Sequence, residues 1–324
     1  MINSFTSTPT TPLLPTSSSS VAPIPTVIPG GKPIYQEIQS TGRRTLWVVT
    51  VLMGLSSLVF YVLTARTVLV LTHLILHYSQ QKEANETQPK RVFHTLVSLI
   101  TTISFISYLA MATGEGYVYK HAEVIQPHKH VPDVALHFCR QVPVARYVNW
   151  MLTSPLLLVN MALLSGLPGA HLLPAVAADL GMFATGLLGT FADRSTSRWI
   201  WFSLSCAAYL GAVYQIGMHG QRAAGNKDPQ TRRFFGSLVA VALLVMALYP
   251  ITLAAGPLAL RLSVDSEIVL FAILDIIVQA LLGYWIIIAH DGSPGMALHI
   301  DGFWAHGASG EGSIRVQDVG DEGP

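Results

Sequence analysis

Apolar residues gather in seven long runs along the chain, and shorter polar stretches separate these runs. The runs are Thr45–Thr64, Val92–Thr113, Tyr147–Leu167, Leu172–Phe191, Trp199–Met218, Phe234–Leu258 and Ile268–Ala289. A bilayer core about 30 Å thick needs about 20 helical residues, and backbone groups in lipid are bonded only in helices or closed barrels. The runs are too long and too continuously apolar for barrel strands. The pattern therefore predicts an all-α membrane protein, a seven-transmembrane-helix bundle over residues 45–290.

Three segments lie outside this bundle or fit it badly. Residues 1–44 are rich in Ser, Thr and Pro, and we expect a disordered tail there because little apolar surface offsets the chain entropy. We expect residues 291–324 to form a second, flexible tail. The apolar insert Val68–Tyr78 follows the first run but is too short to cross a membrane. It is interpreted as a helical extension of the first span, with an amphipathic segment along the membrane interface as the alternative.

Composition and charge agree with a membrane protein and exclude other classes. Of the 324 residues, 51% are hydrophobic and 11% charged, with a mean hydropathy of +0.48, against about 25% charged residues in an average soluble domain. A net charge of +1 gives no basic field for nucleic acid. Cys139 and Cys206 are far apart, so we expect neither a disulfide framework nor a cysteine-based zinc site. Lys and Arg occur on both sides of the predicted membrane, so their distribution does not decide the orientation.

Polar residues inside the spans form two stripes. The stripe on the third predicted helix consists of Arg146, Asn149, Thr153 and Asn160. The stripe on the seventh consists of Glu267, Asp275 and Gln279. Spacings of three, four, seven and eight place each set on one helix face. An unpaired charge at membrane depth is costly, so we expect Arg146 to form an ion pair with Asp275 in the interior. The alternative is that these residues only join neighbouring helices.

Several segments are similar to the microbial rhodopsins. RYVNWMLTSPLLL, residues 146–158, resembles their third-helix signature, in which Arg-Tyr-x-Asp-Trp precedes Thr-Thr-Pro and leucines. Residues 178–189, 248–250 and 271–285 resemble the fourth, sixth and seventh helices, and Tyr108 with YLAMATGEG resembles the second helix of fungal members. The resemblance covers about residues 45–318. It implies the family's seven-helix fold, with an extracellular N-terminus and a cytoplasmic C-terminus.

The departures from the family concern its chemistry. The position of the lysine that forms the retinal Schiff base is Gln279, and an amide cannot form that imine. The counterion and proton-acceptor positions are Asn149 and Asp275, and the cytoplasmic proton-donor position is Asn160. An asparagine neither takes up nor releases a proton near neutral pH. Glu267 stands at a position like that of the extracellular proton-release group. The resemblance thus implies an opsin-related branch that lacks the retinal lysine.

The resemblance also implies a pocket. Its expected lining is Tyr108, Trp150, Thr153, Asp179, Met182, Gly186, Phe202, Met246 and Tyr249. Met246 and Phe202 stand where the family usually has tryptophan. We expect no covalently bound cofactor, and non-covalent retinal or another apolar ligand is left open.

Histidines gather between the second and third spans. They are His121, His128, His130 and His137, with Cys139 nearby. Because the spacing is not that of a regular ligand set, we interpret them as solvated loop histidines and expect no metal site.

Three functions are compatible with these residues, and none is enzymatic. The first is a non-pumping, stress-related or regulatory protein of the plasma membrane, which the likeness to fungal opsin-related and heat-shock membrane proteins implies. Its partners would be the lipid bilayer, further copies of the chain, and a membrane protein such as a proton ATPase. The second is a retinal-dependent photoreceptor or light-driven proton pump. The third is a binder or transporter of a small ligand in the altered pocket.

Overall fold

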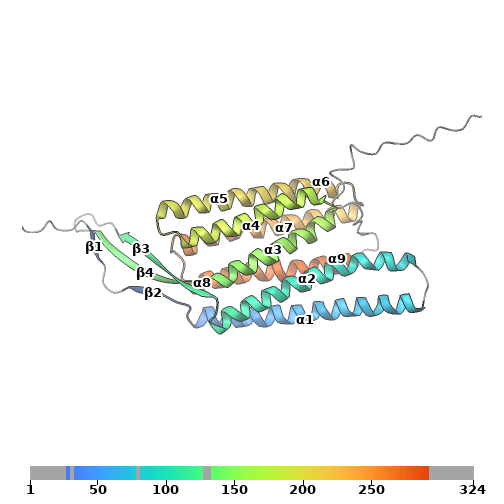
Figure 1. Cartoon of the computed structure of the whole chain (residues 1–324), viewed down its shortest axis with the longest axis horizontal. Coiled ribbons are helices and arrows are strands. Elements are labelled where there is room, and N and C mark those ends of the chain that lie inside the picture. Colours follow the sequence, from blue (N-terminus) through green and yellow to red (C-terminus); the bar gives the residue numbers. More distant parts are fainter. Residues whose placement is uncertain (1–26, 30–32, 78–80, 127–132, 292–324) are drawn as a thin grey trace, which may run out of the picture.

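The chain forms a helical bundle with a small β-sheet at one end (Figure 1). The computed structural model describes residues 27–29, 33–77, 81–126 and 133–291. Among these residues, seven helical segments are long and apolar enough to span a membrane. They are Ser40–Arg66, Val92–Thr113, Val144–Ser165, Gly169–Phe191, Ser195–Ala224, Pro229–Leu258 and Val264–Ala289. The predicted fold class, a seven-helix membrane bundle, is confirmed, and each span overlaps one predicted apolar run.

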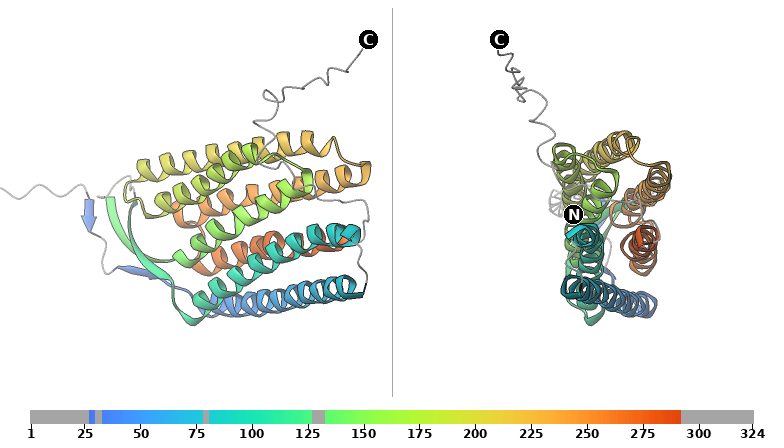
Figure 2. Two further views of the ribbon diagram at one scale, coloured as in Figure 1. Left: turned by 45° about the vertical axis from the view of Figure 1, so that its right-hand side comes forward. Right: turned by 90° about the vertical axis from the view of Figure 1, so that its right-hand side faces the viewer.

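The helices follow one another around the bundle, as the two views in Figure 2 show. The α-helices are α1 (Ser40–His77), α2 (Gln81–Thr113), α3 (Val144–Ser165), α4 (Gly169–Phe191), α5 (Ser195–Val213), α6 (Gly220–Ala224), α7 (Pro229–Leu253), α8 (Val264–Asp275) and α9 (Leu282–Asp291). Each helix from α1 to α4 packs against the next one along the chain. Helix α5 also packs against α7, and α8 packs against α1 and α7. The third and seventh spans are the most buried. The polar stripes predicted on those two helices therefore lie in the interior.

Three short π-helical segments widen the later spans. They are η1 (Tyr214–His219), η2 (Ala254–Leu258) and η3 (Ile276–Leu281). The segment η3 begins directly after Asp275 and contains Gln279. Single π turns inside α-helices occur frequently at functional sites. The seventh span is therefore irregular at the two residues that the sequence singled out.

The insert after the first span is helical. Helix α1 runs without interruption from Ser40 to His77 over 38 residues, so it contains the insert up to its last residue but one. The interpretation of a helical extension is confirmed. Tyr78 lies outside the described residues.

The part of the N-terminal tail that the structure describes is ordered, so the expectation of disorder up to residue 44 is wrong there. Strands β1 (Val27–Pro29) and β2 (Ile34–Gln36) both pair in parallel with β4 (Asp133–Pro143), and α1 already begins at Ser40. The segment gains its order from backbone pairing with a distant strand, a contact that local composition does not reveal. Residues 1–26 and the predicted tail beyond residue 291 lie outside the described residues.

The region between the second and third spans is a β-hairpin rather than a loop. Strand β3 (Tyr117–Gln126) pairs antiparallel with β4, and the two strands extend beyond the end of the bundle (Figure 1). The strands have 10 and 11 residues and mix apolar with polar positions, so neither stands out in a search for apolar runs of membrane-spanning length. The sheet stands over the end of the bundle at which α1 and α3 begin.

Candidate functional site

Asp275 accepts three hydrogen bonds from aromatic side chains. The hydroxyl of Tyr108 donates to Oδ2 at 2.5 Å, and Trp150 Nε1 and the hydroxyl of Tyr249 donate to Oδ1 at 2.8 and 2.7 Å. The donors come from α2, α3 and α7, and the carboxyl group is fully buried. Both oxygens of Asp275 are thus satisfied by neutral donors.

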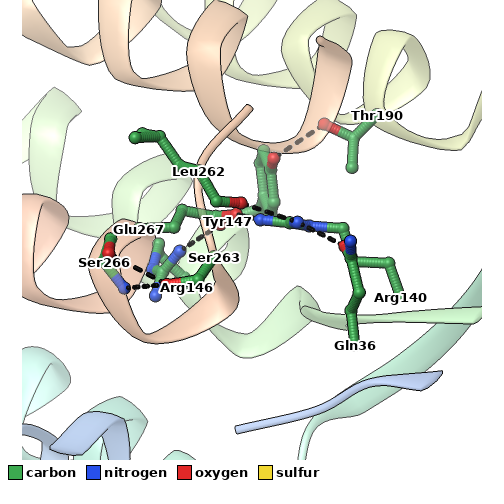
Figure 3. Close-up of polar contacts among 9 residues, drawn as sticks. All are labelled: Gln36, Arg140, Arg146, Tyr147, Thr190, Leu262, Ser263, Ser266 and Glu267. Carbon is green, nitrogen blue, oxygen red and sulfur yellow. Dashed lines mark hydrogen bonds and ion pairs between the residues drawn. The ribbon is translucent and has the colours of Figure 1, made fainter. Parts of the chain in front are cut away.

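The expected ion pair between Arg146 and Asp275 is wrong. The guanidinium of Arg146 binds Glu267 instead, with 2.9 Å between Nη1 and Oε1 (Figure 3). The same guanidinium stacks over the ring of Phe271 at 4.7 Å. Glu267 and Asp275 lie on the same helix face, so spacing alone does not rank them. The carboxylate of Asp275 already has three hydrogen-bond donors, whereas Glu267, which is 4% exposed, is a buried charge that requires oppositely charged partners.

A second arginine binds the same carboxylate. Arg140 Nη2 lies 2.7 Å from Glu267 Oε2, and its Nη1 donates to Gln36 Oε1 at 2.7 Å and to the carbonyl of Leu262 at 3.0 Å. Figure 3 shows the two guanidinium groups converging on Glu267. Sequence reasoning missed Arg140, which lies in a polar stretch outside the spans. Recognising this stretch as a strand that leads directly into the third span would have identified Arg140 as a residue near the bundle interior.

Gln279 is the centre of a second polar group. Its Oε1 accepts from Ser104 Oγ at 2.6 Å and from Asn149 Nδ2 at 3.2 Å, and its Nε2 donates to Thr153 Oγ1 at 3.2 Å. The Oδ1 atom of Asn149 is buried and has no hydrogen-bond partner among the described residues. The amide of Gln279 therefore joins α2, α3 and the seventh span by neutral hydrogen bonds.

A narrow apolar hollow of about 10 Å³, with room for no more than a single water molecule, lies beside Gln279. Its lining includes Ile100, Trp150, Thr153, Ser154, Leu157, Met182, Phe183, Met246, Tyr249, Val278 and Gln279. A second hollow, of about 20 Å³, is lined by Tyr147, Trp150, Met182, Phe183, Gly186, Ser205, Tyr249, Pro250 and Leu253. Four residues line both hollows, so these form two halves of one elongated apolar space. Only the first half has an amide, that of Gln279, at its wall.

Three of the expected pocket residues lie elsewhere. Tyr108 bonds Asp275 rather than lining either hollow. Asp179 is buried behind the lining and accepts from Ser154 Oγ at 2.7 Å. Phe202 packs against the core and against the ring of Trp199. Ser205, one turn further along α5 than Phe202, is the residue that reaches the second hollow.

Asn160 lies deep in the bundle without a hydrogen bond. It is fully buried, and neither Nδ2 nor Oδ1 has a partner among the described residues. An unbonded buried amide costs about 1–3 kcal/mol. Asn160 contributes a polar group to the interior but no titratable one.

The histidine group is only partly described. His121 Nδ1 lies 3.2 Å from Cys139 Sγ across the β3–β4 hairpin. His137 lies opposite Glu123, two positions further along the paired strands. His128 and His130 lie outside the described residues. In the described ranges there is no group of three or more His, Cys, Asp or Glu side chains that could hold a metal ion.

Comparison with known proteins assigns the chain to a family. The family described as bacteriorhodopsin-like protein matches residues 54–291. The chain belongs to this family. Opsin-1 of Neurospora crassa is 36% identical over 303 residues, which cover 93% of each chain. The bacteriorhodopsin of Halobacterium salinarum is 28% identical over 272 residues, which cover 82% of this chain and 88% of that protein.

Solved structures agree with this assignment. The light-driven proton pump LR (Mac) of Leptosphaeria maculans is 33% identical, with a TM-score of 0.72, and the match covers 82% of this chain and all of that structure. The bromide-bound halorhodopsin of Halobacterium salinarum, at 22% identity and a TM-score of 0.66, shares the fold over 80% of this chain and 97% of that one. The bundle is thus the seven-helix fold of the microbial rhodopsins.

Proposed function

We propose that this member of the bacteriorhodopsin-like family carries no covalent retinal and does not pump protons. The observation that carries the proposal is the amide of Gln279, which stands four residues after Asp275 at the wall of the apolar space. An imine requires a primary amine. The lysines of the chain are Lys32, Lys82, Lys90, Lys120, Lys129 and Lys227, and none lies in a candidate span.

The proton-transfer positions support the same proposal. Asn149 and Asn160 cannot exchange protons near neutral pH. Glu267 forms ion pairs with both Arg140 and Arg146. A proton pump requires groups that take up and release protons in turn, and the two asparagines supply no such group.

The role that fits such a protein is regulatory. We propose a stress-related or regulatory protein of the plasma membrane, with its N-terminus outside and its C-terminus in the cytoplasm, that acts through a membrane-protein partner such as a proton ATPase. The basis for this role is the likeness to opsin-related proteins without the retinal lysine. Oligomers of this chain belong to the same proposal.

A second candidate is a binder of a small apolar ligand. The apolar lining of the two hollows favours it, because small-molecule sites are lined mainly by apolar side chains with a few polar groups. The hydrocarbon part of retinal matches the chemistry of this lining, whereas the residues present offer no amine for its aldehyde. A ligand of that size requires the lining side chains to move apart, because the hollows measure only about 10 and 20 Å³. A ligand with a carbonyl or hydroxyl end could bond the amide of Gln279 instead.

Absorption spectroscopy tests the proposal. The full chain is expressed with all-trans-retinal, purified in detergent and compared with the double variant Gln279→Lys with Asn149→Asp, which restores an amine and a carboxylate. We expect no visible band in the unaltered protein and a visible band in the double variant. Gln279→Met with Asn149→Asp, which lacks the amine, is the matched control and should stay colourless.

The outcomes separate the candidates. A visible band in the unaltered protein that survives washing with detergent would overturn the proposal and support the photoreceptor or pump. The Leptosphaeria relative is a light-driven proton pump. If retinal or a related alcohol raises the melting temperature without a visible band, the second candidate gains support, because a ligand stabilises only the state that binds it.

A further inference from the structure

A wide, open hollow lies at the start of α1, away from the pocket and the buried charges. It has a volume of about 690 Å³ and is lined by Ile38, Gln39, Ser40, Arg43, Arg44, Trp47 and Val48. Arg43 and Arg44 are exposed, and Trp47 is 44% exposed. The first candidate span begins at Ser40. The hollow therefore lies at the level where α1 enters the membrane.

The two arginines in the hollow are free to bind an anion. In the part of the chain that the structure describes, neither guanidinium group forms an ion pair with a carboxylate. The acidic groups nearby have other partners, since Asp265 accepts from the backbone N–H of Gln39 at 2.8 Å and Glu37 accepts from the hydroxyl of Tyr119 at 2.9 Å. The hollow thus presents two adjacent positive charges, and arginine matches the geometry of phosphate oxygens.

An apolar stripe continues from the hollow along the outer face of α1. It consists of Val48, Val51, Leu55, Leu58 and Val62, each between 56% and 63% exposed. Spacings of three and four place these residues on one face of the helix, directly after Arg44. Trp47 beside the arginines is a residue type that concentrates at membrane interfaces. Together these features form a surface in which the charged hollow continues directly into the apolar stripe.

We propose that this hollow binds the headgroup phosphate of a glycerophospholipid, with one acyl chain lying along the apolar stripe of α1. The hollow complements the anionic phosphate, and the stripe complements the hydrocarbon chain. A soluble anion would contact the arginines alone, whereas a phospholipid contacts both the arginines and the apolar stripe. Each basic residue near a membrane surface favours an anionic lipid by about fivefold, so phosphatidylglycerol should bind more tightly than phosphatidylcholine.

Fluorescence quenching of Trp47 tests this site. The full chain is placed in phosphatidylcholine nanodiscs that contain either brominated phosphatidylglycerol or brominated phosphatidylcholine at equal mole fraction, and the emission of Trp47 is obtained by subtracting the Trp47→Phe protein. We expect phosphatidylglycerol to quench this emission at a severalfold lower mole fraction. The preference should vanish in Arg43→Gln with Arg44→Gln and persist in Arg43→Lys with Arg44→Lys.

The matched control is Arg232→Gln with Arg233→Gln, an exposed arginine pair at the start of α7 at the opposite end of the bundle. It removes the same charge and should leave the quenching of Trp47 unchanged. Equal quenching by both lipids, or a preference that survives in Arg43→Gln with Arg44→Gln, would overturn the proposal. Loss of the preference in inorganic phosphate, against chloride at matched ionic strength, would reassign the site to a soluble anion.

Discussion

Among the described residues, Glu267 forms ion pairs with two buried arginines, Arg140 and Arg146. Arg140 and Arg146 are each 1% exposed, so neither charge can turn to solvent. Removal of the shared anion leaves two like charges facing one another, whereas removal of either arginine leaves Glu267 with a partner. We therefore expect the loss of Glu267 to lower the stability of the fold more than the loss of either arginine does.

We expect Glu267→Gln to lower the free energy of unfolding by about 3–5 kcal/mol, because breaking a buried ion pair leaves an uncompensated charge. Arg140→Gln alone should cost less, since Arg146 still binds the carboxylate. Thermal unfolding in detergent gives the comparison, with Glu115→Gln at an exposed position as the neutral control. Equal losses from Glu267→Gln and Arg140→Gln would contradict the shared-anion arrangement.

At the scale of elements, strand β3 is fastened to the end of α4 through a buried lysine. Lys120 Nζ donates to the carbonyl oxygens of Thr190 and Ala192. Burial and the nearby charge of Arg198 together lower the pKa of Lys120 to about 8, while Asp193 acts in the opposite direction. The unfolded chain, with a lysine pKa near 10.5, therefore binds more protons than the folded one between pH 8 and 10.5.

This difference sets the sign of a pH dependence. Stability rises with pH wherever the unfolded state binds more protons. We therefore expect the contribution of Lys120 to the free energy of unfolding to increase from about pH 8 to about pH 10.5. The melting temperature of the unaltered protein minus that of Lys120→Met should therefore increase between about pH 8 and about pH 10.5. A constant difference between the two proteins would contradict the expectation.

Elements with a strong local signal were predictable from the sequence, and those formed by distant pairing were not. The spans follow from apolar length, because lipid imposes that length on every helix. Strands β1 and β2 have three residues each and acquire their order only from β4. In the site, the sequence found Glu267, Asp275 and Gln279 on one face, but only side-chain geometry shows which carboxylate Arg146 reaches. Ser205 rather than Phe202 lines the second hollow because of the rotation of α5 about its own axis, which only the structure shows.

At the scale of the whole molecule, the seven spans place the sheet and the loop before α7 on opposite sides of the membrane. The proposed orientation puts the sheet outside. We expect a cysteine introduced as Glu123→Cys in the exposed part of β3 to react with a membrane-impermeant maleimide on intact spheroplasts. Asn226→Cys, at the other end of the bundle, should react only after lysis. Both variants carry Cys206→Ala to remove the partly buried native thiol, and the reverse pattern would invert the topology.

The parallel pairing of β2 with β4 also has a consequence for biosynthesis. Gln36 and Arg140, which join the two strands, lie 104 residues apart in the chain. At a synthesis rate of about 5–20 residues per second, β2 emerges about 5–20 s before its partner strand exists. During that interval the first two spans must insert while the segment before them remains unpaired on its own side of the membrane. A defect in β4 would therefore lengthen the time for which the nascent N-terminal segment is exposed to chaperones and proteases, even where every helix inserts normally.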